Sequence, residues 1–437
     1  MAGGIWSKQN KIRPGAYINV RAKKDDSIKV GERGVVTLPL ILSYGPEQTV
    51  LEITPDDELK DILGFKIESD EALLIRECMK KAKTLLLYRL NKGTAASIAN
   101  EGLTITSKYS GTFGNKLAVI VENSIDVEDA FDVTTLLDEE KVDTQTVTKI
   151  EDLKENFYVK FSGTGELTIT AGVHLAGGED GTVTNTSYTE YLTAIETYDF
   201  ECMGLVSKDS DLKATFANYI KRLRDEEGRK VQLVVENYAA DHEAVTSVKN
   251  GVKLKDGTVL ASDKAVAWVT GATGGAEVNN SNTYVIYEDA VDVDIKYTDT
   301  QIKQALKAGE FVFTVFKGQV VVEQDINTLV TFTDEKTKVF RKNRVIRTLD
   351  GIANDVYNIF MEKYVMNQED NDDFGRDKFR KDIIDLLEAN QKLRSLKNVV
   401  PEDVEVTEGE EIEGVVAKVA AQPVDSMEKL YMDIIVS

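Results

Sequence analysis

The 437-residue chain is poor in the side chains from which metal centres and disulfide frameworks are built. It has two cysteines, Cys78 and Cys202, and two histidines, His174 and His242. Two cysteines are too few for a disulfide framework, and zinc sites usually draw on several cysteines and histidines together. We therefore predict that the chain holds no metal and needs no cofactor.

The sequence also lacks a long hydrophobic run. Its longest apolar stretch extends from Val35 to Leu42 and contains Pro39, whereas a helix that crosses a bilayer needs about 20 apolar residues. Residues 1–10 do not show a basic region followed by an apolar one, which is the pattern of a secretory signal peptide. We therefore expect no membrane insertion, and we expect assembly in a reducing cytoplasm.

Positive charge is in deficit. Lysine and arginine total 53 against 75 aspartates and glutamates, which gives a formal net charge of −22. Proteins that bind nucleic acid or anionic membranes gain affinity by neutralising phosphates, so this charge argues against either as a general function. One stretch, residues 336–347, has basic residues and no acid. It is either a solvated helix start paired with local acids or a surface that faces an acidic partner.

Sequence patterns that mark common catalytic sites are missing as well. The chain has no G-x-x-x-x-G-K-[ST] phosphate loop and no G-x-S-x-G nucleophile elbow. The triplet Asp241-His242-Glu243 lacks the second histidine of a zinc protease, because Thr246 occupies that position. The glycines between Gly271 and Gly275 follow an apolar stretch, and we interpret them as a turn rather than a nucleotide loop. We predict that the chain is not an enzyme.

The chain does contain a mixture of strand and helix patterns. An apolar strand over 200–206, an amphipathic helix over 211–227 and an apolar strand over 231–236 predict a βαβ unit with parallel pairing. Ser187 and Glu190 form an S-x-x-E capping box, which predicts the start of another helix.

The second half of the chain adds a hairpin and helices. Thr298 and Gln301 predict a capped helix, and residues 311–324 predict a hairpin with its turn at Lys317-Gly318. Two amphipathic helices follow. Residues 402–413 are acidic and predict an exposed loop or hairpin, and residues 429–436 predict a terminal strand.

The composition changes at about residue 94. From there to about 183 the chain consists of short alternating runs separated by turn signals, which is typical of a small all-β module. We divide the chain into an arm (1–30), the first part of an α/β core (31–93), the inserted β module (94–183), a central α/β part (184–331) and a C-terminal part (332–437) ending in a strand.

Short segments occur in an order that is specific as a set. They are Arg13 to Ile18, Arg33 to Val36, Tyr44-Gly45-Pro46, Ala95, Tyr109 to Asn115, Ile326 to Leu329, Arg347 to Asp350 and Val424 to Tyr431. With this set the chain resembles the sheath proteins of contractile phage tails. It is most similar to the shorter sheaths of PBSX-type defective prophages and R-type bacteriocins.

The resemblance implies a fold and a function. Sheath subunits form stacked six-fold rings around a tail tube, and the sheath contracts from a metastable extended state to drive the tube through the target envelope. The central α/β core is expected to be subtilisin-like without a protease site, and the insert to be β-sandwich-like. Expected partners are copies of the chain, the tube protein, and baseplate and terminator proteins. Assembly is expected in the host cytoplasm, with release by lysis as part of a virion or phage-tail-like particle.

Two surfaces follow as candidate sites. The resemblance implies that both terminal arms add strands to neighbouring subunits, although the C-terminal strand alone also fits an edge strand within one subunit. The N-terminal run has β propensity and no partner nearby in the sequence. The arm residues are Ala16, Tyr17, Ile18, Val20, Leu430, Met432, Ile434 and Val436. The residues that could face an acidic tube are Lys338, Arg341, Lys342, Arg344 and Arg347.

Other functions remain open at this point. The chain could be a different structural component of a phage tail, such as a baseplate or tube protein, although tube proteins are usually much shorter. A soluble α/β enzyme with a β insert is the less favoured alternative. If the chain is a sheath subunit, we expect the inserted β module to lie on the outside of the particle, because insertions usually lie at surfaces.

Overall fold

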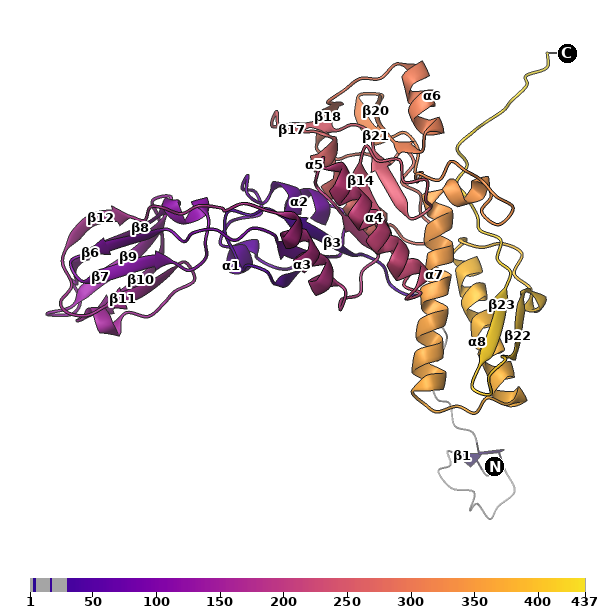
Figure 1. The fold of residues 1–437 in the computed structure, drawn as a ribbon, viewed down its shortest axis with the longest axis horizontal. Coiled ribbons are helices and arrows are strands. Elements are labelled where there is room, and N and C mark those ends of the chain that lie inside the picture. Colours follow the sequence, from indigo (N-terminus) through magenta and orange to yellow (C-terminus); the bar gives the residue numbers. More distant parts are fainter. Residues whose placement is uncertain (1–2, 5–15, 18–29, 437) are drawn as a thin grey trace.

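The computed structural model describes residues 3–4, 16–17 and 30–436. A β-rich module lies at one end of an elongated molecule, an α/β body lies in the middle, and a helical C-terminal region lies at the other end (Figure 1). The fold is mixed α/β, as predicted.

A seven-stranded sheet forms the centre of the body. Its order is β19-β15-β14-β13-β3-β5-β4, and every pair is parallel except β4 with β5. The strands are β3 (Val35–Leu40), β4 (Val50–Ile53), β5 (Thr84–Arg89), β13 (Cys202–Gly204), β14 (Gln232–Glu236), β15 (Val245–Val248) and β19 (Glu310–Phe311). The helices of the body are α1 (Leu59–Leu63), α2 (Leu73–Met79), α3 (Asn185–Ile195), α4 (Ser210–Asp225) and α5 (Ser262–Gly275). The predicted βαβ unit is confirmed, because β13 and β14 pair in parallel and α4 connects them.

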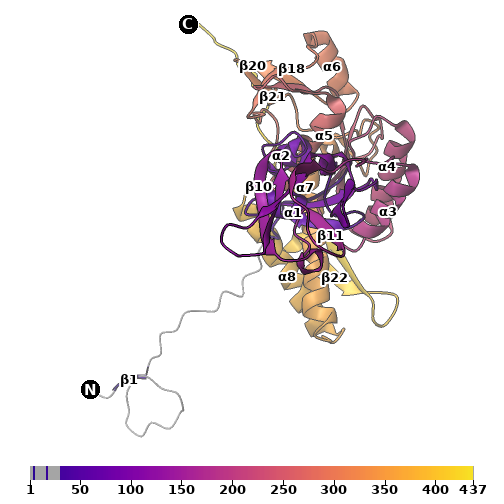
Figure 2. The ribbon, with the colours of Figure 1, turned by 90° about the vertical axis from the view of Figure 1, so that its left-hand side faces the viewer.

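The two faces of this sheet build two separate cores, because successive side chains of a strand point to opposite faces. On β5, Leu85 and Leu87 belong to the core that contains α2 and α5, whereas Leu86 and Tyr88 belong to the core that contains α3 and α4. Figure 2 shows α3 and α4 together at one side of the molecule. Coverage of both faces explains why the strands are apolar throughout.

The glycine-rich segment lies inside α5, so the interpretation as a turn is wrong. A Cβ atom at Gly271 would lie 2.2 Å from the backbone oxygen of Cys78, and one at Gly274 would lie 2.3 Å from Val36 Cγ1. The glycines therefore let α5 approach α2 and the sheet more closely than any side chain would allow. The sequence predicted a turn there because glycines usually interrupt helices.

The inserted module consists of two antiparallel sheets with the orders β10-β9-β8-β12 and β11-β7-β6. Its strands are β6 (Ser97–Asn100), β7 (Leu103–Ser107), β8 (Leu117–Asn123), β9 (Phe131–Leu137), β10 (Glu140–Val147), β11 (Val159–Gly163) and β12 (Thr170–His174). Buried polar groups hold it to the body. The fully buried Arg89 donates to the carbonyl oxygens of Gly45 and Ser110, and Asn91 donates to those of Leu42 and Asp180.

Two helix starts test the capping predictions. The helix α6 (Asp299–Lys307) begins after Thr298, whose N–H donates to Gln301 Oε1 at 2.9 Å, so that capping box is confirmed. The helix α3 begins earlier than predicted. Its N-cap is Thr184, and Ser187 is the third residue of the helix rather than its cap. The box pattern was therefore placed one turn too late.

Smaller sheets complete this part of the chain. The predicted hairpin is confirmed, with Lys317 and Gly318 at its turn in the left-handed region (φ 50° and 80°). Its strands are β20 (Phe313–Phe316) and β21 (Gln319–Val322), and a three-stranded sheet contains β16 (Val252–Leu254), β17 (Val259–Leu260) and β18 (Ala290–Val293).

The C-terminal region is a pair of helices with a hairpin. Helix α7 (Asn343–Ile359) continues into a π-helical turn (Phe360–Val365), and α8 (Asp373–Lys392) follows. The acidic stretch forms the first strand and the turn of an antiparallel hairpin, β22 (Val404–Glu408) and β23 (Val415–Val419). Between α7, α8 and the hairpin lies a third core, which contains Ile352, Phe379, Leu386 and Val404.

Candidate functional site: the roots of the two terminal arms

The C-terminal arm leaves the body as an extended segment (Figure 1). Residues 424–436 have no regular secondary structure, so the predicted terminal strand over 429–436 is absent from the single subunit. Leu430, Met432, Ile434 and Val436 expose 83%, 67%, 79% and 91% of their surface. A lone strand leaves its backbone groups without partners, so the strand pattern needs a sheet edge, and residues 429–436 join none in the structure.

A polar clamp holds the root of this arm. Glu428 is bound by Lys342 Nζ, by Gln324 Nε2 at 2.7 Å and by Thr283 Oγ1 at 2.8 Å. Burial alone would raise the pKa of Glu428, but these three hydrogen bonds outweigh it and leave the pKa below its usual value. The carboxylate therefore stays charged at neutral pH and keeps the clamp closed.

The preceding residues are fixed as well. Asp425 lies 3.5 Å from Lys342 Nζ, and Ser426 Oγ accepts a hydrogen bond from Arg344 Nη1 at 3.0 Å. The backbone N–H of Val424 donates to the oxygen of Ser395 at 2.8 Å. The arm is therefore attached up to Glu428 and fully exposed beyond it.

The N-terminal arm is described in part. Ala16 and Tyr17 form the two-residue strand β2, which pairs in parallel with β1 (Gly3–Gly4). The prediction that this run has no local partner is therefore wrong for these two residues. The other two arm residues, Ile18 and Val20, lie outside the described residues, which resume at Val30.

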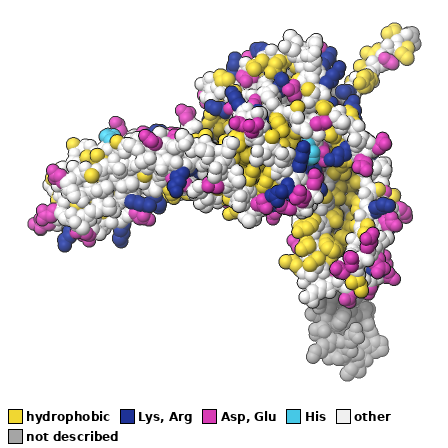
Figure 3. Space-filling view, in the orientation of Figure 1, with side chains coloured by type: hydrophobic (Ala, Val, Ile, Leu, Met, Phe, Trp, Pro, Cys, Tyr) yellow, Lys and Arg dark blue, Asp and Glu magenta, His cyan; other side chains and the backbone are white. Residues whose placement is uncertain are grey.

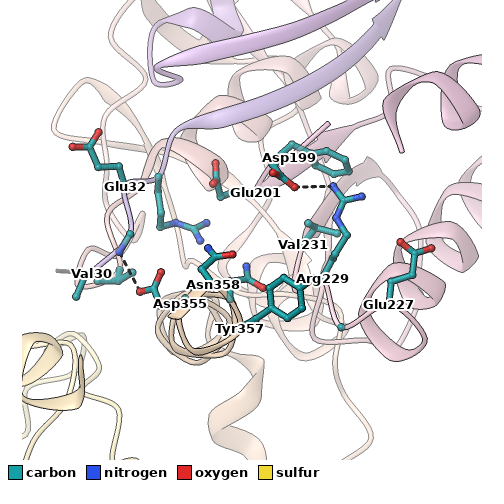
Figure 4. A pocket seen from close by; sticks show the side chains of 17 residues that line it. Val30, Glu32, Asp199, Glu201, Glu227, Arg229, Val231, Asp355, Tyr357 and Asn358 are labelled. Atoms are coloured by element: carbon teal, nitrogen blue, oxygen red, sulfur yellow. Dashed lines mark hydrogen bonds and ion pairs between the residues drawn. The ribbon is translucent and has the colours of Figure 1, made fainter. Parts of the chain in front are cut away.

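The root of the N-terminal arm crosses a polar cleft of about 510 Å³, which Figure 4 shows. Within it, the backbone N–H of Gly31 donates to Asp355 Oδ2 at 3.1 Å, and those of Gly34 and Val35 donate to Glu201 Oε2 at 3.1 and 2.7 Å. Burial raises the pKa of Asp355 and of Glu201. The acids of this cleft thus serve to hold the chain as it enters the sheet.

Both roots are attached to the same helix. Lys342 immediately precedes α7, and Asp355 lies near its end. Between them α7 is pinned to the body by two buried ion pairs, Arg347 with Asp325 at 2.6 Å and Asp350 with Arg224 at 2.8 Å.

The basic stretch does not form one free surface. Arg347 is fully buried against Asp325, so its assignment to a tube-facing surface is wrong. Lys342 and Arg344 hold the C-terminal arm instead. Lys338 is exposed and Arg341 is half-buried, so these two are still able to meet a partner. Sequence spacing could not have found the clamp, because Lys342 and Glu428 lie far apart in the chain and on different elements.

The hairpin β22–β23 is a second feature of this region. Among the described residues its sheet contains these two strands alone. Beside it lies a cavity of about 230 Å³ lined by Phe360, Tyr364, Phe379 and Val415. Figure 3 shows hydrophobic side chains along the lower half of α7 and acidic side chains gathered on the neighbouring side.

The described residues offer no metal centre. They contain no group of three or more histidine, cysteine or acidic side chains placed to hold a metal ion. Burial lowers the pKa of His242 to about 4 and raises the pKa of the buried thiols of Cys78 and Cys202. No helix in the described part of the chain is both long and apolar enough to cross a bilayer.

Comparison with known families gives matches along nearly the whole chain. The matching family models are the tail sheath protein Gp18 domain III N-terminal region over 33–90, the phage tail sheath protein beta-sandwich domain over 91–180, the phage tail sheath protein central domain over 181–328 and the phage tail sheath C-terminal domain over 335–437.

Individual proteins agree with these matches. Protein XkdK of the phage-like element PBSX from Bacillus subtilis (strain 168) is 38% identical over 464 residues, covering 99% of each chain. A crystal structure of a sheath tail protein from Desulfitobacterium hafniense is 47% identical, with a TM-score of 0.88 over 96% of this chain and 99% of that one. The contracted helical sheath of the anti-feeding prophage has a similar fold, with a TM-score of 0.58, 13% identity, and coverage of 98% and 100%.

Proposed function

The chain belongs to the phage tail sheath protein family, and from this premise we propose that it forms a contractile sheath. The proteins of this family are structural tail components and not enzymes, which sets aside the enzyme alternative. In the proposed function the subunits polymerise as stacked six-fold rings around a tail tube. Contraction from a metastable extended state drives the tube through the target envelope.

The exposed C-terminal arm is the observation that carries this proposal. Its apolar side chains are exposed and have strand alternation, and the segment joins no sheet of the described part of its own subunit. A strand that joins an open sheet edge gains backbone hydrogen bonds for affinity, and alternate side chains fix the register. An arm of this kind is suited to binding a second copy of the chain.

The hairpin β22–β23 is the edge that we propose as its acceptor. A two-stranded sheet is marginal on its own and gains stability when further strands extend it. Acidic side chains surround it, and the N-terminal arm has the opposite charge. The basic residues of that arm are Lys8, Lys11, Arg13, Arg21, Lys23, Lys24 and Lys29, and its acids are Asp25 and Asp26. Charge complementarity of this kind favours the N-terminal arm of another copy at the same hairpin.

The remaining partners are part of the same proposal. The sheath would enclose the tail tube and end at baseplate and terminator proteins, and Lys338 and Arg341 would face the tube. Assembly would take place in the host cytoplasm, with release by lysis. Strand pairing suits a contracting lattice, because subunits can pivot about a ladder whose hydrogen bonds persist.

Deletion of either arm tests the linking role. Removal of residues 1–20, or of Leu430 to Ser437, should leave a soluble folded subunit that cannot form long tubes, measured by circular dichroism and negative-stain microscopy. Residues 430–436 are exposed and lie outside the cores of the subunit. Normal contractile tubes from a subunit without residues 1–20 would refute the role of that arm.

Proline substitutions provide a sharper version with matched controls. In an edge strand alternate N–H groups point to the partner, so one of Asp433→Pro and Ile434→Pro should remove a ladder hydrogen bond. That variant should assemble poorly, whereas Asp433→Ser and Ile434→Thr should assemble normally. Equal assembly by all four variants would contradict pairing through the backbone.

A further inference from the structure

We propose that helix α7 is a rigid strut that sets the spacing between the two links of each subunit. The root of the C-terminal arm is fixed at one end of α7, and the root of the N-terminal arm is fixed near the other. This inference rests on the proposed linking role of the arms. It assigns a positioning role to Lys342, Glu428 and Asp355.

The root of the C-terminal arm is fixed by the clamp on Glu428. Three groups from three different segments converge on one carboxylate, and the Lys342 ammonium among them directly precedes the first turn of α7. Charge-assisted hydrogen bonds are directional and short, so they fix the position of Glu428. The next residue, Lys429, is exposed, and the free part of the arm starts there.

The root of the N-terminal arm is held by Asp355 and by apolar packing. Asp355 Oδ2 accepts the N–H of Gly31, and the side chain of Val30 packs on the core that contains Ile352 and Ile359 of the same helix. Figure 4 shows Asp355 directed from the helix toward the chain at Val30. The described chain therefore leaves the body at this end of α7.

The helix between the two roots is built to resist movement. Lys342 and Asp355 are separated by 13 positions (355 − 342), which corresponds to about 20 Å at a rise of 1.5 Å per residue. Arg347 and Asp325 are fully buried as an ion pair, and Arg224 binds Asp350 with two parallel hydrogen bonds. Thr348 Oγ1 also donates to the oxygen of Val278 at 2.9 Å. The two roots are thus held at a fixed separation along α7, which is itself pinned to the body.

The proposed role of α7 predicts a result that a purely stabilising role of Glu428 and Asp355 does not. Sites about 20 Å apart affect stability independently, so the destabilisation by Glu428→Ala and that by Asp355→Ala should add. Their effects on assembly should not add, because loss of either root already frees the spacing. Each variant alone should raise the critical concentration for tube formation about tenfold, as for one lost charge-assisted hydrogen bond.

The experiment is a double-mutant cycle on the full chain. Melting temperature and critical concentration are measured for wild type, Glu428→Ala, Asp355→Ala and the double variant, with the exposed Glu335→Ala and Glu362→Ala as controls. Additive melting temperatures with non-additive critical concentrations are expected. Additive effects in both measurements, or assembly unchanged in both single variants, would overturn the strut.

A second measurement keeps this result separate from the proposed function. Deletion of Leu430 to Ser437 tests the link itself and leaves the clamp intact. If that deletion assembles normally, the proposed linking role is wrong. If it abolishes tubes while Glu428→Ala and Asp355→Ala assemble as wild type, the linking role stands and the strut is wrong.

Discussion

At the scale of single residues, the most informative side chain is Glu428. It lies on a segment without secondary structure, yet Lys342, Gln324 and Thr283 all bind it. Residues of the basic stretch that looked suited to an external partner are used inside the subunit. The basic stretch in this acidic chain thus fixes the root of the C-terminal arm, a segment that burial alone could not hold in place.

The Glu428 clamp should weaken in acid. Because its pKa in the folded state is lowered, its stabilising contribution is complete above the ordinary glutamate pKa of about 4.3 and is lost as the pH falls through the lower folded-state pKa. Glu428→Gln should therefore cost roughly 1 kcal/mol at pH 7 and progressively less toward pH 3.

Melting temperatures of wild type and Glu428→Gln between pH 7 and pH 3 measure this difference. Glu335→Gln is the control, because it makes the same substitution at an exposed acid outside the clamp. A difference between wild type and Glu428→Gln that stays constant or grows as the pH falls would contradict the charged clamp.

At the scale of elements, the sequence predicts correctly those helices and strands whose pattern lies within a short stretch of the chain. The strand–helix–strand unit of β13, α4 and β14 follows from periodicity, and the hairpin of β20 and β21 follows from its Lys317-Gly318 turn. The predictions were wrong where contacts with a distant segment determine the local structure. Gly271 lies within α5, where the lack of a side chain lets α2 pack closely. Residues 429–436 join no sheet among the described residues of the subunit.

The candidate site shows the same division. The predicted residues of the C-terminal arm are exposed in the structure, and their linking role stays a prediction. The contacts of Glu428 and Asp355 join segments far apart in the chain, so no spacing in the sequence signals them. Arg347 was misplaced for the same reason, because its buried partner Asp325 belongs to a different segment.

Packing of α5 against α2 gives a prediction at this scale. In an exposed helix glycine-to-alanine replacement stabilises by about 1 kcal/mol. At Gly271 the added Cβ would meet a backbone oxygen at 2.2 Å, so Gly271→Ala should destabilise by roughly 1–3 kcal/mol instead. Gly351→Ala in α7 is the matched control, because its nearest neighbour is a side-chain atom at 3.2 Å. Urea unfolding of both variants measures this, and equal stability would show that α5 can shift.

At the scale of the whole molecule, the inserted module and the C-terminal region lie at opposite ends (Figure 1). If the linked ends form the continuous mesh of the sheath around its tube, the module points away from the axis. Arg89 and Asn91 hold it to the body through buried hydrogen bonds, so it is a rigid projection rather than a tethered one. If the module lies on the outside, its position is fixed within the subunit and should be the same in every copy.

Selective labelling tests this arrangement. Both native cysteines are buried, so a maleimide should react selectively with a cysteine introduced at Ile125, which is 98% exposed in the inserted module. Streptavidin should bind biotinylated Ile125→Cys on intact sheath–tube assemblies as well as on free subunits. Lys338→Cys should bind it on free subunits alone, because we place Lys338 on the side that faces the tube. Labelling of Lys338→Cys on intact assemblies would show that this residue does not face the tube, and protection of Ile125→Cys there would show that the module is not outside.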